Sequence, residues 1–342
     1  MKLKQIHLIV FLLTQVILKP AFSDEVGTSA EEPLEENELE YLLKPFEDDF
    51  FDFLDTPHEI ISEGVEAAAQ GMDLFFADEK IYHETTSSYA RLSTQVNFNH
   101  GGEYTTTGDL HLKVDLKETK KKLKLLLKSD SDRDIQTGIN SNTTPGQPKE
   151  TVNFYAALQK EISKKHEWST KASLGVKLKV PLDPFFYVRA NKDFDVAPWK
   201  IHFSENLFWF NSKGAGASSL LEVDYPLTKR LLFRSTTSEL WTDFLDYHEG
   251  SQVFSLYHEI TDRRAISYSI GVNGTSKPNI HRDSYFTSIN YRQRIHRDWL
   301  FLDISPAISY ARSNNYQANR SLTMRLEMVF GNQYVYRPPT GN

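Results

Sequence analysis

His202 and Ser204 come nearest to a catalytic arrangement, because they lie two residues apart in the stretch WKIHFSENLFWF. Residues two apart in a β-strand point to the same face, so this pair would share a face with Lys200 and Asn206. A histidine beside a serine can accept the hydroxyl proton and turn that oxygen into a nucleophile. The alternative is that both are members of an ordinary polar strand face, since no third group that orients the histidine can be placed.

Metal ligation is a second chemistry open to histidines and carboxylates. His248 and His258 are each followed by a glutamate, but adjacent residues of a strand point to opposite faces, and neither pair belongs to an HExxH motif. The chain has no cysteine, which excludes thiolate ligands and disulfide bonds. The acidic residues at 47–55 lack the glycine and the closing glutamate of a calcium loop. We therefore predict no metal site and no cofactor.

The segments that must position these residues alternate apolar and polar side chains with a period of two, as β-strands do. In TTTGDLHLKVDLK one face carries Asp109, His111, Lys113 and Asp115, and the other carries leucine, valine and glycine. A soluble sandwich can also alternate, but nearly every segment from Ser88 onward repeats the pattern. A charged face opposite an apolar face suits a strand with lipid outside and a wet interior.

These segments predict a transmembrane antiparallel β-barrel of about fourteen strands over residues 87–331, with about twelve as the fallback if 181–198 holds no full strand. Short connections alternate with longer ones, as periplasmic turns and outer loops do in outer-membrane barrels. The polar segment 129–150 is expected to be one of the outer loops. Phe330 ends the last strand, SLTMRLEMVF, and is expected to close the barrel and to be recognised by the barrel-assembly machinery.

The polar faces of these strands are predicted to line the lumen. Basic side chains exceed acidic ones there, which favours a pore for anionic or polar solutes. The alternative is that the charges neutralise each other across strands and fill a closed lumen. The predicted lumen-lining residues are Arg91, Asp109, His111, Lys113, Asp115, Lys171, Lys177, Lys179, Arg189, Lys200, Glu222, Arg234, Arg292, Arg325 and Glu327.

The ends of the chain differ from the barrel in composition. Residues 1–23 combine a basic start, a short apolar run and small residues, which predicts a secretory signal peptide. Residues 24–57 are strongly acidic and predict a disordered periplasmic arm, although the formal net charge of the whole chain is only −7. Residues 58–86 predict an amphipathic helix with a linker, and 332–342 a periplasmic tail with a proline pair.

Several motifs resemble those of known outer-membrane proteins. YRQRIHRDWLFLDISP and SLTMRLEMVFG resemble a group of uncharacterised proteobacterial outer-membrane proteins, and the likeness runs from about Phe75 to Gly331. That resemblance implies an outer-membrane barrel and no known activity, and the loop YARSNN departs from the Pro-Arg-Glu-like turn of the group. The His202-x-Ser204 pair resembles the dyad of outer-membrane lipid A deacylases and of the outer-membrane phospholipase, without the Asn-Gly context.

We therefore expect an outer-membrane β-barrel of a Gram-negative cell, with both termini in the periplasm, that is a passive pore or a structural barrel. Outer-membrane lipids and the barrel-assembly machinery are its expected partners, and nucleic acid is not. One alternative is a lipid-modifying enzyme that uses His202 and Ser204. Another is an assembly partner whose acidic arm, 24–57, docks a periplasmic protein.

Overall fold

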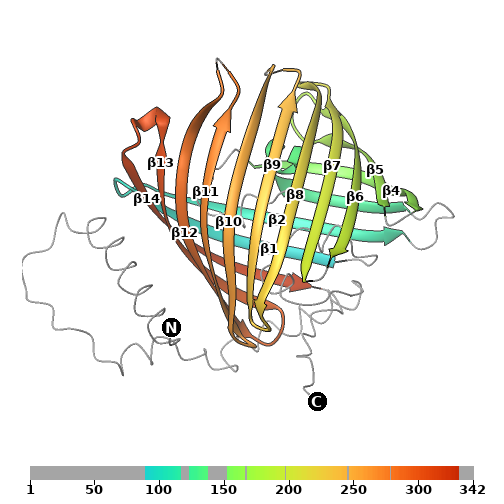
Figure 1. Cartoon of the computed structure of the whole chain (residues 1–342). Coiled ribbons are helices and arrows are strands. Elements are labelled where there is room, and N and C mark those ends of the chain that lie inside the picture. Colours follow the sequence, from blue (N-terminus) through green and yellow to red (C-terminus); the bar gives the residue numbers. More distant parts are fainter. Residues whose placement is uncertain are drawn as a thin grey trace, which may run out of the picture.

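The computed structural model describes residues 89–116, 123–137, 152–165, 168–196, 198–244, 246–277 and 279–330. Fourteen antiparallel strands follow one another around a ring, and β1 pairs with β14 to close a barrel (Figure 1). The prediction of a barrel of about fourteen strands is confirmed, and the fallback of twelve is wrong. The strands are β1 Tyr89–Asn99, β2 Tyr104–Leu116, β3 Leu123–Asp130, β4 Asn153–Lys165, β5 Trp168–Lys177, β6 Asp183–Val196, β7 Trp199–Phe210, β8 Gly214–Thr228, β9 Leu231–Thr242, β10 Tyr247–Thr261, β11 Arg264–Thr275, β12 His281–His296, β13 Leu300–Ala311 and β14 Ala318–Phe330.

The segment 181–198, on which the strand count depended, contains the full-length strand β6. This strand pairs with β5 on one side and with β7 on the other. The helical elements of the described residues are α6, Asp132–Thr137, and the 3₁₀ turn η3, Arg312–Asn314. The predicted signal peptide 1–23, acidic arm 24–57, helix and linker 58–86 and C-terminal tail 332–342 lie outside the described residues.

Side chains alternate between the outer and inner faces of the barrel wall, as the period of two requires. On the outer face Leu92 is 45% exposed and Leu174 is 66% exposed, while their neighbours Ser93 and Ser173 point inward and are buried. The outer surface is therefore largely apolar and the inner surface largely polar, which is the arrangement of a barrel in a lipid bilayer. No helix of the described residues is long and apolar enough to cross a membrane.

Part of the inner wall is aromatic rather than charged. Phe185 lies over Gly175 of the neighbouring strand, and Phe208 lies over Gly216 in the same way. A Cβ at Gly175 would come within 2.6 Å of the Phe185 ring, so the glycine makes room for the aromatic side chain. We did not predict this aromatic region from the sequence. Its buried members, named here the inner aromatic cluster, are Leu126, Ile135, Tyr155, Ala157, Phe185, Tyr187, Phe208, Phe210 and Leu240.

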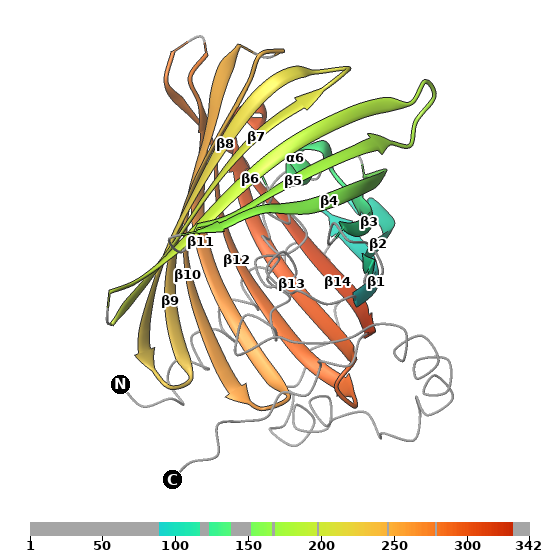
Figure 2. The same ribbon diagram turned by 90° about the vertical axis from the view of Figure 1, so that its right-hand side faces the viewer.

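The helix α6 lies inside the ring of strands (Figure 2), where it packs beside β3, β7, β8 and β9. The prediction that 129–150 is entirely an outer loop is wrong over its first part. Ser129 and Asp130 complete β3, and the chain then turns inward at Ser131. Ile135 of α6 belongs to the inner aromatic cluster, so burial of an apolar side chain draws this connection into the lumen.

Candidate functional site

The N-terminal end of α6 is fixed to the barrel wall through the carboxylate of Asp132. Lys177 Nζ on β5 lies 2.6 Å from Asp132 Oδ1, and Lys213 Nζ from the β7–β8 connection lies 2.7 Å from Oδ2. Tyr155 and Asn153 of β4 donate further hydrogen bonds to Oδ1. Burial raises the pKa of the Asp132 carboxyl, but the hydrogen bonds from the two lysines and the tyrosine outweigh it and hold the pKa at about 2. Asp132 is therefore ionised at neutral pH.

The C-terminal end of α6 is held by hydrogen-bond donors on β6, β7 and β8. Arg189 Nη2 of β6 donates to the carbonyl of Ile135 at 3.3 Å, and Ser218 Oγ of β8 donates to the carbonyl of Gln136 at 2.7 Å. Asn206 of β7 also donates to the Gln136 carbonyl. The last carbonyls of a helix have no partner within it, so these wall donors complete their hydrogen bonding. The guanidinium also complements the negative end of the helix.

A third attachment reaches the far wall. Arg133 forms an ion pair with Glu249 at the start of β10. The helix is thus bonded to strands β4 to β8 and to β10, and these contacts determine where it lies in the lumen.

Two basic side chains stand opposite one another beside this helix. Lys171 on β5 is the direct cross-strand partner of Arg189 on β6, and both point inward and are buried. Like charges directly opposite on a sheet are unfavourable, but Lys171 also has the carboxylate residue Glu161 of β4 as its cross-strand partner on the other side. Arg189 also lies over the Tyr187 ring, with 5.4 Å between the guanidinium carbon and the ring centroid. Arg189 therefore makes the wall next to the C-terminal end of α6 locally basic.

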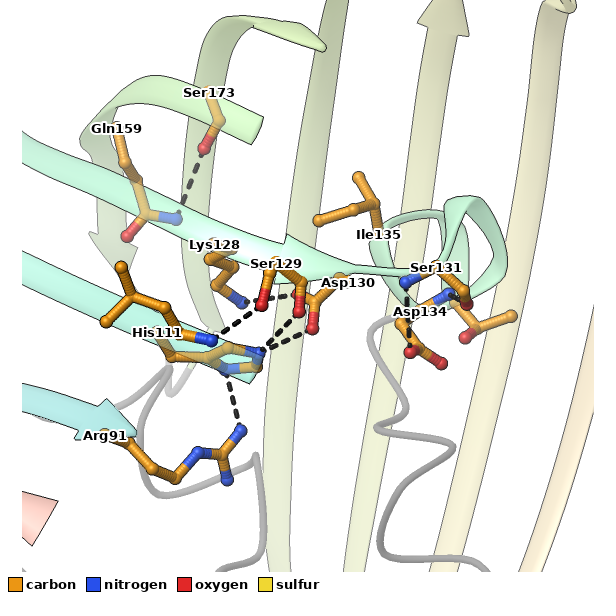
Figure 3. A network of polar contacts seen from close by, with 12 residues as sticks. Arg91, His111, Lys128, Ser129, Asp130, Ser131, Asp134, Ile135, Gln159 and Ser173 are labelled. Atoms are coloured by element: carbon orange, nitrogen blue, oxygen red, sulfur yellow. Dashed lines mark hydrogen bonds and ion pairs between the residues drawn. The ribbon is translucent and has the colours of Figure 1, made fainter. Parts of the chain in front are cut away.

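A second buried group joins β1, β2 and β3 (Figure 3). Arg91 Nη2 lies 2.7 Å from His111 Nδ1, and His111 Nε2 lies 2.6 Å from Asp130 Oδ1. Lys128 Nζ is 3.8 Å from the other carboxylate oxygen. A guanidinium has only donors, so Nδ1 must accept, and the ring proton lies on Nε2, which donates to the Ser129 carbonyl at 3.3 Å. The arrangement cross-links three strands directly below the point where the chain turns into α6.

A third group lies on β12, β13 and β14. Arg292 Nη1 contacts both carboxylate oxygens of Asp303 at 3.0 and 2.8 Å, and its Nη2 bonds to Glu327. Arg325 Nε reaches Asp303 Oδ2 at 3.0 Å. The Phe301 ring lies under the Arg292 guanidinium at 4.3 Å. We name these four charged residues the Arg292 network, and their burial makes them a structural brace of the closing strands.

Most predicted lumen-lining residues lie on the inner face. Lys179 does not belong to a strand, because β5 ends at Lys177, and its ammonium pairs with Asp183 at 3.0 Å. Lys200 is the second residue of β7 and is exposed at the end of the barrel. Asp115 lies in β2, but its side chain is outside the described part. Buried on the inner face are Arg91, Asp109, His111, Lys113, Lys171, Lys177, Arg189, Glu222, Arg234, Arg292, Arg325 and Glu327.

His202 and Ser204 both point inward, but each hydrogen-bonds to a residue of β6 rather than to the other. His202 Nδ1 lies 2.7 Å from Asp193 Oδ1, and Ser204 Oγ donates to Asn191 Oδ1 at 2.7 Å. The serine hydroxyl proton is therefore directed at an amide oxygen and not at a histidine nitrogen. The structure does not assemble the serine–histidine dyad that the spacing suggested.

Sequence reasoning missed α6 and the residues that hold it. Asp132 and Tyr155 looked like members of a polar loop and of an ordinary strand. One signal was available, since Phe185 and Tyr187 have the same parity as the inward Arg189 and so had to point inward. Among the described residues, no group of three or more histidine or carboxylate side chains is placed to hold a metal ion.

No protein-family model and no curated protein matches the chain. Solved outer-membrane barrels do resemble it. A low-pH structure of OprB from Pseudomonas putida has a TM-score of 0.44 and 11% identity over 78% of this chain and 99% of that one. A loop-deleted OmpT, an outer membrane protein of Vibrio cholerae, has a TM-score of 0.42 and 8% identity over 71% and 98%. The outer membrane channel DcaP of Acinetobacter baumannii has a TM-score of 0.41 and 6% identity over 71% and 96%. At such identities the likeness concerns the fold alone.

Proposed function

We propose that this protein is an outer-membrane pore for small polar solutes, narrowed by a helix fixed inside its lumen. A barrel of about eight strands is filled by its own side chains, whereas one of about sixteen leaves a water-filled channel. Fourteen strands lie near the upper end of this range. The wall is also apolar outside and largely polar inside, as a water-filled lumen requires.

The observation that carries this proposal is the attachment of α6 at both of its ends. Asp132 binds two lysines at one end, and Arg189, Asn206 and Ser218 bind the last carbonyls at the other. A connection held in this way keeps one position in the lumen. It therefore defines a constant aperture, which a passive pore needs to select by size.

The basic wall beside α6 gives the aperture a preference for anions. Arg189 and its cross-strand neighbour Lys171 raise the local concentration of anions on this part of the inner wall. Elsewhere on the inner face, buried carboxylates such as Asp303 and Glu327 offset most of the arginines and lysines. The preference is therefore local and modest, in place of the net-basic lumen that the sequence suggested.

The proposal places the barrel in the outer membrane of a Gram-negative cell, with Tyr89 and Phe330 toward the periplasm. Membrane lipids surround it, and the assembly machinery recognises its last strand. Docking of a periplasmic protein by the acidic arm stays a prediction, since 24–57 lies outside the described residues. No lipid-modifying activity is proposed, because the Ser204 hydroxyl bonds to Asn191.

The test is conductance of the purified full-length chain in planar lipid bilayers. We expect uniform steps of current and a reversal potential that shows a modest preference for anions in a salt gradient. Folding is checked on the same sample by the faster migration of the unheated barrel in gel electrophoresis. A folded, inserted barrel that gives no current steps would rule out the pore and leave a closed structural barrel.

A further inference from the structure

The outer face of the barrel carries polar side chains over β7 to β10, where lipid-facing residues would be apolar. Their inward neighbours, such as Asn206, Ser218 and Ser238, are buried, so these side chains point outward. Side chains of Leu207, 57% exposed, and Phe254, 45% exposed, flank them. We name this group the polar stripe. Its members are Glu205, Ser219, Ser235, Thr237, Glu239, His248 and Gln252.

The polar stripe extends below the level of the lipid headgroups. Trp209 and Trp241 lie on the outer face near the loop ends of β7 and β9, and tryptophan prefers the headgroup level. Glu205 and Thr237 each lie four positions from the tryptophan of the same strand, toward the middle of the barrel. Four residues span roughly 13 Å along a strand, which a tilt of about 40° reduces to roughly 10 Å of depth. Both side chains therefore lie at the level of the hydrocarbon.

The members of the stripe hydrogen-bond to one another. Ser219 Oγ donates to Glu205 at 2.6 Å, and Thr237 Oγ1 donates to Gln252 Oε1 at 2.6 Å. Gln252 Nε2 in turn donates to Ser235 Oγ at 2.9 Å. These bonds leave acceptor capacity on the Glu205 carboxylate, and lipid chains offer it no donor. A charged group on the lipid face of a barrel is destabilising at this depth.

At the upper end of the stripe, Glu239 and His248 form an exposed pair. His248 Nδ1 lies 2.6 Å from Glu239 Oε1, and the two side chains are 55% and 58% exposed. The stripe thus presents acidic acceptors and histidine, hydroxyl and amide donors on one surface. It contains no lysine or arginine, so it does not suit the phosphates of lipid headgroups. Ala217 and Gly250 lie on the same outer face and would allow a close approach.

We propose that the polar stripe is the contact surface for a second copy of this chain. A two-fold contact places each patch against the same patch of its partner, so donors of one copy meet acceptors of the other. The Glu239 carboxylate of each copy can then accept from His248 or Thr237 of the other. The carboxylate of Glu205 is removed from lipid by the same contact. This inference rests on the proposed membrane-spanning barrel but not on an open pore.

The experiment uses cysteine cross-linking in native outer membranes, because the chain contains no cysteine of its own. Thr237→Cys and Ser219→Cys are made singly in the full-length chain and treated with a short bis-maleimide. Leu174→Cys is the matched control, since Leu174 is exposed on the outer face of β5, outside the stripe. We expect a covalent dimer from the stripe variants, in at least ten times the yield of the control. Equal yields, or monomer throughout, would overturn the proposal.

A second variant tests the same surface without a cross-linker. Glu205→Leu combined with Glu239→Leu makes the stripe more apolar, so the barrel still folds in lipid while the dimer fraction falls at least tenfold in detergent. An unchanged dimer fraction in a folded barrel would show that these carboxylates do not form the contact. Failure of the wild-type chain to fractionate with the outer membrane would instead contradict the proposed location. If the wild-type chain and the stripe variants are all monomeric but still conduct, the proposed pore is supported and the proposed contact surface is contradicted.

Discussion

Lys177 of β5 and Asp132 of α6 form an ion pair with 2.6 Å between Nζ and Oδ1, and each side chain is only 9% exposed. The pair joins a membrane strand to a helix that has left the wall. Without Lys177, the Asp132 carboxylate in the first turn of α6 would stay buried inside the barrel with Lys213 as its remaining lysine partner. Lys177, which the sequence predicted to be on the inner wall, therefore helps to determine the position of the helix.

Replacement of Asp132 by alanine should loosen α6 and change the aperture. Removal of one partner of a buried ion pair costs about 3–5 kcal/mol, because the other charge stays buried. We expect larger and noisier current steps, with the barrel still closed by its strand ladder. Single-channel recording and thermal unfolding measure the two effects. Asp246→Ala is the control, because Asp246 is 85% exposed and lies 3.8 Å from Lys277; an equal effect of both substitutions would contradict this role for Asp132.

The same contact predicts how the aperture responds to acid. The pKa of Asp132 is about 2, below its ordinary value of 3.8, so the ionised form is favoured in the folded protein. The contribution of the ion pair is complete above the ordinary pKa and is lost as the pH falls through about 2. Conductance should therefore stay constant from neutral pH to about pH 4 and change only near the lower value. In Asp132→Asn this change should be absent, and a wild-type transition centred near pH 4 would contradict the assignment.

Lys171 and Arg189 should control the preference for anions. Lys171→Glu replaces a like-charged cross-strand pair with an opposite-charged one, which removes the locally basic wall. We expect the reversal potential to shift toward cation preference, with no gain in stability, because the new carboxylate also stands opposite Glu161 of β4. Lys277→Glu, at an exposed loop position, is the control and should shift it far less. A reversal potential that is unchanged in Lys171→Glu would place the selective region elsewhere.

Arg292→Met should destabilise the closing strands. It leaves Asp303 and Glu327 buried beside one fewer cation, and the expected loss is about 3–5 kcal/mol. Urea unfolding followed by gel mobility measures this loss. Arg230→Met is the control, because Arg230 is 57% exposed and its ion pair with Asp262 is at the surface, where such pairs contribute about 0–1 kcal/mol. Similar losses in both variants would show that the Arg292 network is not a brace.

Phe330 should matter for assembly, unlike the residues after it. It is the last residue of β14 and stands opposite Ala90 of β1, so it lies at the seam where the barrel closes. We expect Phe330→Ala to lower the amount of folded barrel in the outer membrane several-fold. Deletion of 332–342 should leave that amount unchanged. If the deletion abolishes folding, residues after Phe330 are also needed for assembly, which would contradict this prediction.

Alternation along each segment was enough to assign the strands and their inner and outer faces. It placed Arg325 and Glu327 on one face of the last strand and Asp109, His111 and Lys113 on one face of the second, and all five are buried on the inner wall. This works because the face of a residue depends only on its position relative to neighbours two residues away. The same local rule cannot say which charges meet across strands.

The partners of these charges were decided by the register and closure of the barrel. Arg292 meets Asp303 because β12 and β13 pair in one register, and it meets Glu327 because β14 follows next. His202 and Ser204 bond to Asp193 and Asn191 for the same reason, so their spacing along the chain was misleading. Contacts of this kind join residues far apart in sequence, and no local pattern encodes them.

The sequence by itself determined the barrel: about fourteen alternating segments, an apolar outside, a polar inside and an aromatic last residue. Only the tertiary structure decided that 132–137 folds into the lumen, since that depends on the fit of Ile135 to the inner aromatic cluster and of Asp132 to Lys177 and Lys213. The period of two is a property of the extended backbone, which every strand shares. The position of α6 depends instead on packing against a wall that exists only after the strands have closed.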